Sequence, residues 1–265
     1  MRAILFDVDG TLADTERDGH RKAYNRAFRK LGLGFRWGPK LYRKLLRQPG
    51  GKERINHYLH RYQPELGEHA EAVAESTGAW VEHVHGLKSR YFRRLVRRGQ
   101  LPLRPGVGRL MREAHAAGLK IGIVSNASRA SLTPLMRYSL GAELTGFLNC
   151  VVCGEDMPRK KPAPDLYRLA LKQLQLRADE CLAIEDSATG LKAARAAGIA
   201  TLITCNDDTY GQDFKAALMV LDNLGEPERP MQVLQGALTT EKSWVTADGL
   251  QSLFATYTPP EGESA

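Results

Sequence analysis

The sequence predicts an α/β protein in which a doubly wound parallel sheet carries an all-helical insertion after its first strand. Three observations lead to this fold class. From Leu101 onward, short continuous apolar runs alternate with amphipathic helical segments, as a parallel sheet covered by helices on both faces requires. One more apolar run opens the chain. Between that run and residue 100 the periodicity is helical.

The first strand is expected over about residues 2–7, and the insertion follows it as a series of helices. Apolar residues recur at helical spacing over 17–31, and the glycines between 32 and 38 end that pattern. Further helices are expected at about 39–47, 52–63 and 69–98, because Pro49, Gly50, Gly51 and Pro64 interrupt the pattern between them. The insertion is therefore expected to contain no strand.

After residue 101 the predicted strands lie at 120–125, 150–153, 181–185, 200–204 and 218–221, with helices near 106–117, 129–139, 164–175 and 188–197. From about residue 225 the periodicity is weak, and we expect one or two helices packed on the sheet domain and a frayed terminus. The predicted domains are 1–14 with 101–225, the insertion 15–100, and the tail 226–265. Ligands of such sheets bind beyond the carboxyl ends of the strands.

Composition limits the classes of function. The net charge of +8 and the pI near 9.4 favour anionic partners. The basic residues gather in 36–62 and 88–98, where a solvated helical face explains most of them, and no zinc-finger or RNP-like pattern accompanies them. We therefore expect a phosphorylated metabolite as the partner, rather than nucleic acid or a membrane.

The chain has no apolar run of about 20 residues and no signal-peptide pattern at its start, so a soluble cytoplasmic protein is expected. Its four cysteines are few and lie in apolar surroundings, which suits a reducing compartment. Cys150 and Cys153 form a Cys-x-x-Cys pattern, but no second pair completes a zinc site. We expect buried thiols there.

The first strand runs directly into two carboxylates, Asp7 and Asp9, and then Gly10. Spacing of two would aim both carboxylates the same way if the chain stayed extended, and Gly10 allows a sharp turn after them. Such a pair suits a divalent cation, or a division into nucleophile and proton carrier. A solvated turn is the alternative, since Asp and Gly are ordinary turn residues.

The later strands also end in reactive or phosphate-binding side chains. Ser125 and Asn126 follow the second predicted strand, where a hydroxyl, an amide and backbone N–H groups can hold phosphate oxygens. Glu185 and Asp186 end the fourth, and Lys161 lies on a proline-stiffened connection before a helix. Helix caps and surface charges could explain each residue separately. Together they favour a single site at the strand ends.

These residues resemble the haloacid dehalogenase superfamily. Phe6-Asp7-Val8-Asp9-Gly10-Thr11-Leu12 is similar to its first motif, Ser125 to its second, Lys161 to its third and Glu185-Asp186 to its fourth. The resemblance covers about residues 1–222 and implies a Rossmann-like core with a helical cap domain. The segments 14–21 and 50–54 are similar to those of the CbbY family, xylulose-1,5-bisphosphate phosphatases of carbon-fixing bacteria and plastids.

By that resemblance, Asp7 is the nucleophile that forms an aspartyl phosphate and a ligand of Mg²⁺, with Asp186 and the Asp9 backbone carbonyl as further ligands. Glu185 would hold a metal-bound water. The resemblance implies that Lys161, Ser125 and Asn126 hold the phosphoryl group, and that the Asp9 side chain is the general acid and base.

The resemblance also assigns substrate recognition to the cap. Glu16 and His20 would contact sugar hydroxyls, and the Gly50-Gly51 turn would approach the substrate. Lys52, Arg54 and Lys88 are candidates for binding a second phosphate that is not transferred. In the alternative interpretation, Lys52 and Lys88 are solvated helix charges and His20 is a packed histidine.

We therefore expect a monomeric Mg²⁺-dependent sugar-phosphate phosphatase, most consistent with xylulose 1,5-bisphosphate as substrate. A phosphomutase like β-phosphoglucomutase and a phosphoglycolate phosphatase are the alternatives with the same chemistry. A non-catalytic anion-binding protein is the alternative of a different class, but it would be expected to lose at least one of Asp7, Asp9, Lys161 or Asp186. The compartment is the cytoplasm or, as an alternative, the plastid stroma.

Overall fold

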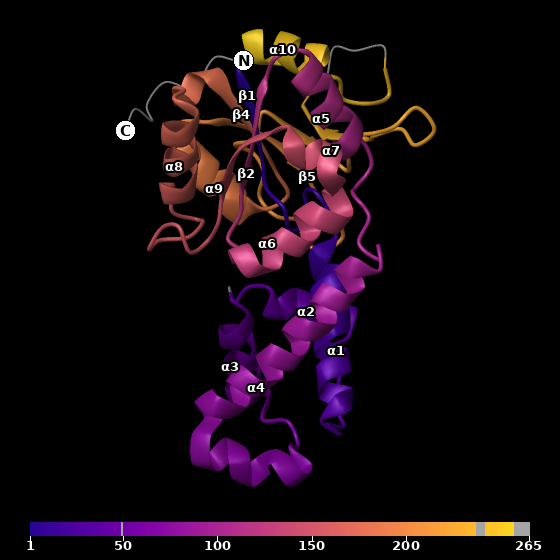
Figure 1. Ribbon diagram of the computed structural model, residues 1–265, viewed down its shortest axis with the longest axis vertical. Helices are drawn as coiled ribbons and strands as arrows, with labels where there is room; N and C mark the ends of the chain where they lie inside the picture. Colours follow the sequence, from indigo (N-terminus) through magenta and orange to yellow (C-terminus); the bar gives the residue numbers. More distant parts are fainter. Residues whose placement is uncertain (49, 237–241, 257–265) are drawn as a thin grey trace. The chain divides into compact units, whose positions relative to one another are not determined.

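The computed structural model describes residues 1–48, 50–236 and 242–256, and it divides into two compact units (Figure 1). The core unit is Met1–Asp14 with Pro102–Ala265, and the helical unit is Thr15–Leu101. Pro49, which the sequence places between two helices, and the expected frayed terminus lie outside the described residues. Within the described residues, no helix combines the length and the apolar character that a membrane span needs.

A seven-stranded sheet, counted over the described residues, organises the core unit in the order β3-β2-β1-β4-β5-β6-β7. Its strands are β1 (Ala3–Phe6), β2 (Lys120–Val124), β3 (Leu148–Val152), β4 (Cys181–Glu185), β5 (Ala200–Thr204), β6 (Met219–Leu221) and β7 (Val233–Gln235). All neighbours pair parallel except β7, which pairs antiparallel with β6. The strand order reverses between β1 and β4, and such a switch point is where doubly wound sheets bind ligands.

Helices cover both faces of the sheet, which confirms the predicted α/β class (Figure 1). α8 (Asp165–Leu174) and α9 (Ala188–Ala196) lie on one side, where their apolar residues pack on Ala3 and Leu5 of β1. α5 (Val107–Ala116) lies on the other side. All four residues of β1 are fully buried, as a strand covered on both faces must be.

Three elements of the core unit differ from the sequence prediction. The helix expected over 129–139 is α6 (Arg129–Leu135) followed by a π-helical turn, η3 (Met136–Leu140), and α7 (Gly141–Gly146) was not expected. Gly141 has a positive φ of 79°, which lets the chain change direction where α7 begins. β7 was also missed, because it is a three-residue edge strand whose residues are all exposed and so carries no burial pattern.

The tail adds a helix to the core unit, as expected. α10 (Ala247–Ala255) begins at Thr246, whose side chain accepts a hydrogen bond from the N–H of Gly249. Leu250 of α10 is fully buried, and the helix packs against α5. A single buried face therefore holds this helix on the core.

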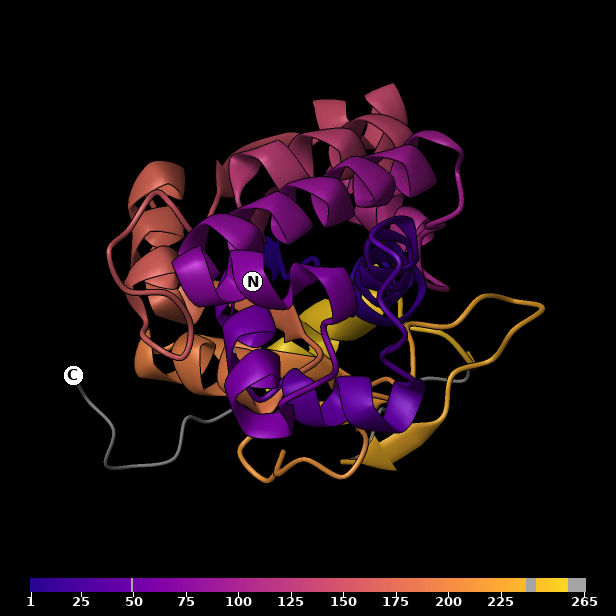
Figure 2. The same ribbon diagram turned by 90° about the horizontal axis from the view of Figure 1, so that it is seen from below.

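The helical unit contains η1 (Thr15–His20), α1 (Arg21–Lys30), α2 (Pro39–Leu45), α3 (Gly51–Tyr62), η2 (Gly67–His69) and α4 (Ala70–Arg97) (Figure 2). α1 packs against α4, and an aromatic cluster fills the interior. The Trp37 ring lies 4.5 Å from that of Tyr24 and 4.9 Å from that of Phe28, centroid to centroid. Such rings bury large apolar areas and so stabilise a small unit.

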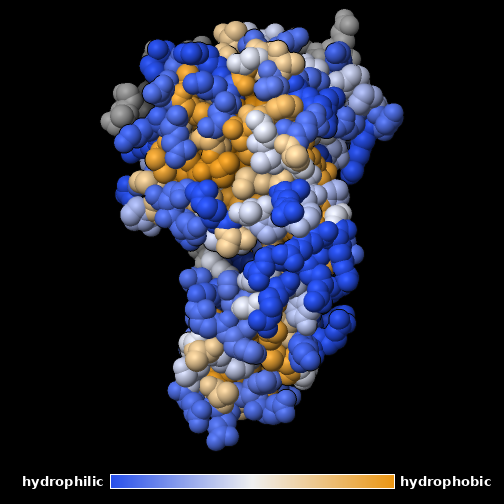
Figure 3. Space-filling model, viewed as in Figure 1, coloured by the Kyte–Doolittle hydropathy of each residue, from blue (hydrophilic) through white to orange (hydrophobic). Residues whose placement is uncertain are grey.

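The long helix predicted at 69–98 is not continuous. Ser76 has φ −156° and ψ 90° inside α4, so two helices meet there. The Ser76 hydroxyl accepts a hydrogen bond of 3.3 Å from the N–H of Ala79, as a residue at a helix start does. Beyond this break, the surface over the second half of α4 is strongly hydrophilic (Figure 3).

Candidate functional site

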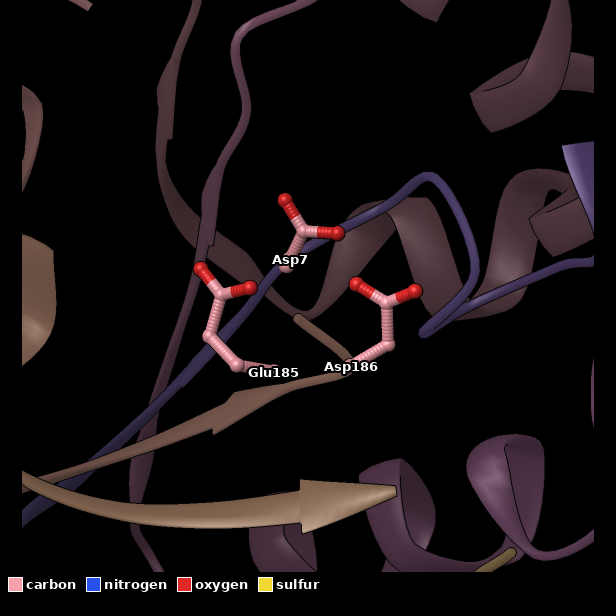
Figure 4. Close-up of side chains that lie close together, drawn as sticks. All are labelled: Asp7, Glu185 and Asp186. Atoms are coloured by element: carbon pink, nitrogen blue, oxygen red, sulfur yellow. The ribbon is translucent and has the colours of Figure 1, made fainter. Parts of the chain in front are cut away.

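The switch point brings three buried acids together at the carboxyl ends of β1 and β4. Asp7, Glu185 and Asp186 each offer a carboxylate oxygen, and these oxygens all lie within 4.8 Å of one another. Figure 4 shows the three side chains converging from the two strands. Carboxylate oxygens are the ligands that Mg²⁺ prefers, so the donor set fits a hard divalent cation.

Lys161 is the positive charge among these acids. Its Nζ lies 2.8 Å from Asp7 Oδ1 and 2.5 Å from Glu185 Oε1, and it donates a 2.6 Å hydrogen bond to the carbonyl of Val124. Burial opposes the charge on Lys161, but Asp7 and Glu185 outweigh it and raise the lysine's pKa. One ammonium thus faces three carboxylates, which leaves negative charge in excess.

The excess of negative charge also affects the pKa values of Glu185 and Asp186. Burial raises the pKa of Glu185 to about 7, although Lys161 acts to lower it. Burial, followed by repulsion from Asp7 and Glu185, raises the pKa of Asp186 well above its usual range. A divalent cation would offset both effects, because it supplies the charge that the buried acids lack.

Gly10 shapes the turn that follows the two aspartates. Its φ is +94°, and a Cβ placed there would overlap Asp186 Oδ2. Only glycine therefore fits between the turn and the Asp186 carboxylate. Asp9 is half-buried and forms an isolated bridge with Ala13. Among the described residues its side chain does not belong to the acidic cluster.

Ser125 and Asn126 lie directly after β2, as the sequence predicts. Ser125 is fully buried, and its Oγ accepts a 3.0 Å hydrogen bond from the N–H of Ala127. The Asn126 carboxamide accepts a 2.8 Å bond from the Lys161 N–H and donates a 3.1 Å bond to the Lys161 carbonyl. Both ends of that amide are thus engaged by backbone, and Asn126 holds the segment that carries Lys161.

Three further residues contact this site without having been predicted. Tyr167 donates a 2.6 Å hydrogen bond to Glu185 Oε1, and Asn206 donates one of 2.7 Å to Asp186 Oδ2. Buried Arg104 donates to the carbonyls of Thr204, Cys205 and Asp222, and also to that of Gly10. Asn206 follows β5, so the rule that polar residues at strand ends form the site would have found it.

The helical unit contains a second cluster of polar side chains, formed by Glu16, Tyr42 and Arg54. Tyr42 donates a 2.5 Å hydrogen bond to Glu16 Oε2, and Arg54 Nη1 lies 3.0 Å from Tyr42 Oη and 3.5 Å from Glu16 Oε2. The structure therefore joins two predicted residues, Glu16 and Arg54, through a tyrosine that the sequence prediction missed. Burial, and then the Glu16 carboxylate, raise the pKa of Tyr42 well above its usual value.

His20 and Lys88 pack against the same ring. The His20 imidazole stacks on Phe92 at 4.0 Å, and Lys88 Nζ lies 5.5 Å from the Phe92 centroid and 5.0 Å from that of Tyr24. Burial lowers the pKa of His20 well below its usual value, and Lys88 adds to the effect. The alternative in which Lys88 is a solvated helix charge is wrong, because only 7% of the residue is exposed.

The turn at Gly50 and Gly51 is closely packed. Gly50 has a φ of +91°, and a Cβ on Gly51 would lie 2.6 Å from the ring of His85. The Gly51 carbonyl accepts a 2.9 Å hydrogen bond from Tyr24. Lys52, by contrast, is exposed and forms an ion pair with Glu82.

All four cysteines are buried and free, as predicted for Cys150 and Cys153. Burial raises the pKa of the Cys150 thiol to about 11 and that of Cys181 to about 12. These thiols pack as small apolar groups.

Comparisons with known proteins identify the family of the chain and its relatives. A family model described as "Hydrolase: haloacid dehalogenase-like hydrolase" matches residues 1–198. "Protein CbbY, plasmid" of Cupriavidus necator is 44% identical over 231 residues, which cover 87% of this chain and 89% of that protein. A "CBBY-like protein" of Arabidopsis thaliana is 36% identical over 85% of this chain and 70% of its own length.

A solved structure is similar over most of both chains. It is a crystal structure of a CbbY mutant from Rhodobacter sphaeroides in complex with xylulose-(1,5)bisphosphate, with a TM-score of 0.75 and 34% identity. The match covers 86% of this chain and 96% of that one.

Proposed function

The chain belongs to the haloacid dehalogenase-like hydrolase family, and we propose that it is a Mg²⁺-dependent sugar-phosphate phosphatase acting through an aspartyl phosphate on Asp7. The observation that carries this proposal is the contact of Asp7 with Lys161 inside a buried acidic cluster at the switch point of the sheet. A carboxylate can attack a phosphate dianion only if cations offset the repulsion between them.

In the first step, Asp7 Oδ2 attacks phosphorus while its Oδ1 stays bound to Lys161. The bond from phosphorus to the sugar oxygen breaks, and the Asp9 side chain gives its proton to that oxygen. Lys161 neutralises charge on the phosphoryl group, and the Ser125 hydroxyl donates to it. The products of this step are the sugar and a phosphorylated Asp7.

In the second step, the Asp9 carboxylate takes a proton from water as that water attacks phosphorus. The acyl-phosphate bond to Asp7 breaks, which releases inorganic phosphate and restores the Asp7 carboxylate. Asp9 then holds the proton that the next leaving group needs. One residue thus serves as acid and as base, so that no proton is gained or lost over the cycle.

Asp7, Asp186 and the Asp9 carbonyl would hold the Mg²⁺, with Glu185 close by. When bound, the ion polarises the phosphoryl oxygens and reduces their negative charge. The excess of acids over Lys161 supports this assignment, because three buried carboxylates beside one ammonium form a site for a cation.

We propose xylulose 1,5-bisphosphate as the substrate. Support comes from relatives named CbbY at 34–44% identity, one of which was crystallised in complex with this ligand. The helical unit supports a substrate with a second phosphate group, because it buries two cations, Arg54 and Lys88, that can attract such a group. We further propose that Glu16 and His20 recognise sugar hydroxyls and that the basic residues bind the second phosphate.

A phosphate-release assay with Mg²⁺ tests the proposal on xylulose 1,5-bisphosphate, ribulose 1,5-bisphosphate, β-glucose 1-phosphate and phosphoglycolate. The first of these is expected to show the highest kcat/KM, and the Asp7→Asn variant should lose at least about 10³-fold in rate. Equal rates for wild type and Asp7→Asn would exclude Asp7 as nucleophile. Formation of glucose 6-phosphate without net phosphate release would instead identify a phosphomutase.

A further inference from the structure

A carboxamide from the end of β5 contacts one of the three buried acids. Asn206 lies two residues after the end of β5, and its Nδ2 is 2.7 Å from Asp186 Oδ2 and 3.3 Å from the carbonyl oxygen of Gly10. The side chain therefore connects the end of β4 to the turn that follows Asp9.

The orientation of this amide is fixed by its other end. Asn206 Oδ1 accepts hydrogen bonds from the N–H groups of Asp208, at 2.9 Å, and Thr209, at 3.2 Å. An oxygen that accepts from two N–H groups cannot exchange places with the NH₂ group without losing both bonds. The donor end of the amide must therefore face Asp186 and Gly10.

One oxygen of Asp186 is enclosed as a result. Asn206 donates to Oδ2, and Gly10 lies so close that a Cβ on it would overlap the same oxygen. With Oδ2 held on two sides, the carboxylate cannot rotate freely, and Figure 4 shows one of its oxygens pointing toward Asp7 and Glu185. Such hydrogen bonds to a ligating carboxylate orient it and tune its affinity for a metal.

We propose that Asn206 is a positioning residue for the divalent cation, because it holds the Asp186 carboxylate in its ligating orientation and ties it to the Gly10 carbonyl. The Asp9–Gly10 turn, whose Asp9 carbonyl is a proposed ligand, is thereby fixed relative to Asp186. The inference rests on the proposed Mg²⁺-dependent function of the same site. It predicts an effect on metal affinity in the absence of any substrate.

Direct Mn²⁺ binding tests this, measured on the full chain by electron paramagnetic resonance without substrate. The Asn206→Ala variant is expected to bind Mn²⁺ about 10- to 100-fold more weakly than wild type. Thr209→Val is the matched control, because it removes the hydroxyl that accepts from the Asn206 N–H and so perturbs the same turn, yet leaves the carboxamide. It should change the affinity by less than about threefold. Asp186→Asn identifies the signal of this site, and thermal unfolding verifies that each variant is folded.

The inference is overturned if Asn206→Ala binds Mn²⁺ as tightly as wild type. It is equally overturned if Thr209→Val loses as much affinity as Asn206→Ala, since the turn rather than the amide would then be responsible. Wild-type protein that binds no Mn²⁺ would exclude both the metal site and this role. Binding that depends on Asn206 in a protein that hydrolyses none of the four phosphate esters would support the inference and contradict the proposed function.

Discussion

The core unit and the helical unit both bury charged residues, but with opposite signs in excess. In the core, three buried acids, Asp7, Glu185 and Asp186, outnumber two buried cations: Lys161 pairs with the acids, and Arg104 donates to backbone carbonyls. In the helical unit, two buried cations, Arg54 and Lys88, are accompanied by the partly buried Glu16. An acidic group attracts a metal ion, whereas a basic group attracts the anion that the metal does not bind. In the proposed function, this difference assigns chemistry to the core unit and recognition of the second phosphate to the helical unit.

The units also stabilise their charges differently. In the core, the charged groups contact each other and backbone carbonyls, as Lys161 does with Val124. In the helical unit, aromatic rings contact the buried cations. Arg54 lies 5.3 Å from the Tyr42 centroid, and Lys88 lies over Tyr24 and Phe92. The negative face of an aromatic ring attracts a cation, so these two cations are stabilised with fewer buried acids beside them than Lys161 has.

The largest effect is expected from Lys161→Met. Removal of the ammonium leaves Asp7 and Glu185 buried without their partner, which should lower the free energy of unfolding by about 3–5 kcal/mol. The phosphatase rate should fall at least about 10³-fold. Urea unfolding and the phosphate-release assay measure the two effects, with exposed Lys160→Met as the control for charge. If Lys161→Met is as stable as Lys160→Met, the ion pairs of Lys161 with Asp7 and Glu185 do not stabilise the buried acids of the core.

Arg54→Met tests the other half of the comparison. A charged hydrogen bond contributes about 1.5–3 kcal/mol, so the KM for xylulose 1,5-bisphosphate should rise roughly 10- to 100-fold. Hydrolysis of phosphoglycolate, which has one phosphate, should change less than about threefold, because the core is intact. Arg61→Met, on the exposed face of the same helix, is the control. If Arg54→Met impairs hydrolysis of both substrates equally, Arg54 does not act specifically on the second phosphate.

The sequence predicted the core site better than the helical one, for a physical reason. At a parallel sheet the carboxyl ends of the strands meet at one edge, so Asp7, Ser125 and Asp186 could be brought together from strand predictions alone. Lys161 was predicted to belong to the same site because it lies on a proline-stiffened connection before a helix. Asn206 obeys the same rule and was overlooked. Tyr167, by contrast, reaches Glu185 from the first turn of α8, where nothing in its spacing separates it from a core residue.

In the helical unit, residue types were recognised but their arrangement was not. Helical periodicity places Tyr24 and Tyr42 on apolar faces, yet their hydroxyls contact Gly51 and Glu16 from other helices. Which helices meet depends on side-chain packing, which periodicity does not specify. Lys88 shows the consequence, because a lysine within a basic stretch of sequence turned out to be buried against two rings.

Acid should act on the two units in opposite directions in metal-free protein. Burial lowers the pKa of His85 to about 4, and Lys88 and Lys52 contribute; His20 is lowered as well. The unfolded helical unit therefore binds protons first, and its stability falls as pH drops from about 6.5 toward 4. In the core, Glu185 has its pKa raised to about 7, so the folded state binds protons first. Core stability thus rises as pH drops from about 7 to 4.5.

Hydrogen exchange in the presence of EDTA, corrected for intrinsic rates, measures this at pH 7 and pH 5. Protection in the helical unit should fall roughly 20-fold through His85 alone, because its folded pKa is about 4 and pH 5 lies 1.5 units below its unfolded pKa of 6.5, while protection in the core rises. His85→Gln should reduce the loss, and exposed His60→Gln should not. The same direction of change in both units would contradict the assigned difference in buried charge.

The smallest effect concerns the exposed ion pair between Lys52 and Glu82, whose side chains are 45% and 59% exposed. Such a pair contributes about 0.2–1 kcal/mol, so Lys52→Met and Glu82→Gln should both leave the free energy of unfolding almost unchanged. Their effects on catalysis should differ. If Lys52 binds the second phosphate, Lys52→Met raises the KM for the bisphosphate roughly three- to tenfold, whereas Glu82→Gln, which releases the lysine from its partner, leaves it unchanged or lowers it. Equal KM values for the two variants would show that Lys52 is a solvated charge on α3 and does not bind the second phosphate. Arg54 and Lys88 would then be the phosphate-binding cations of the helical unit.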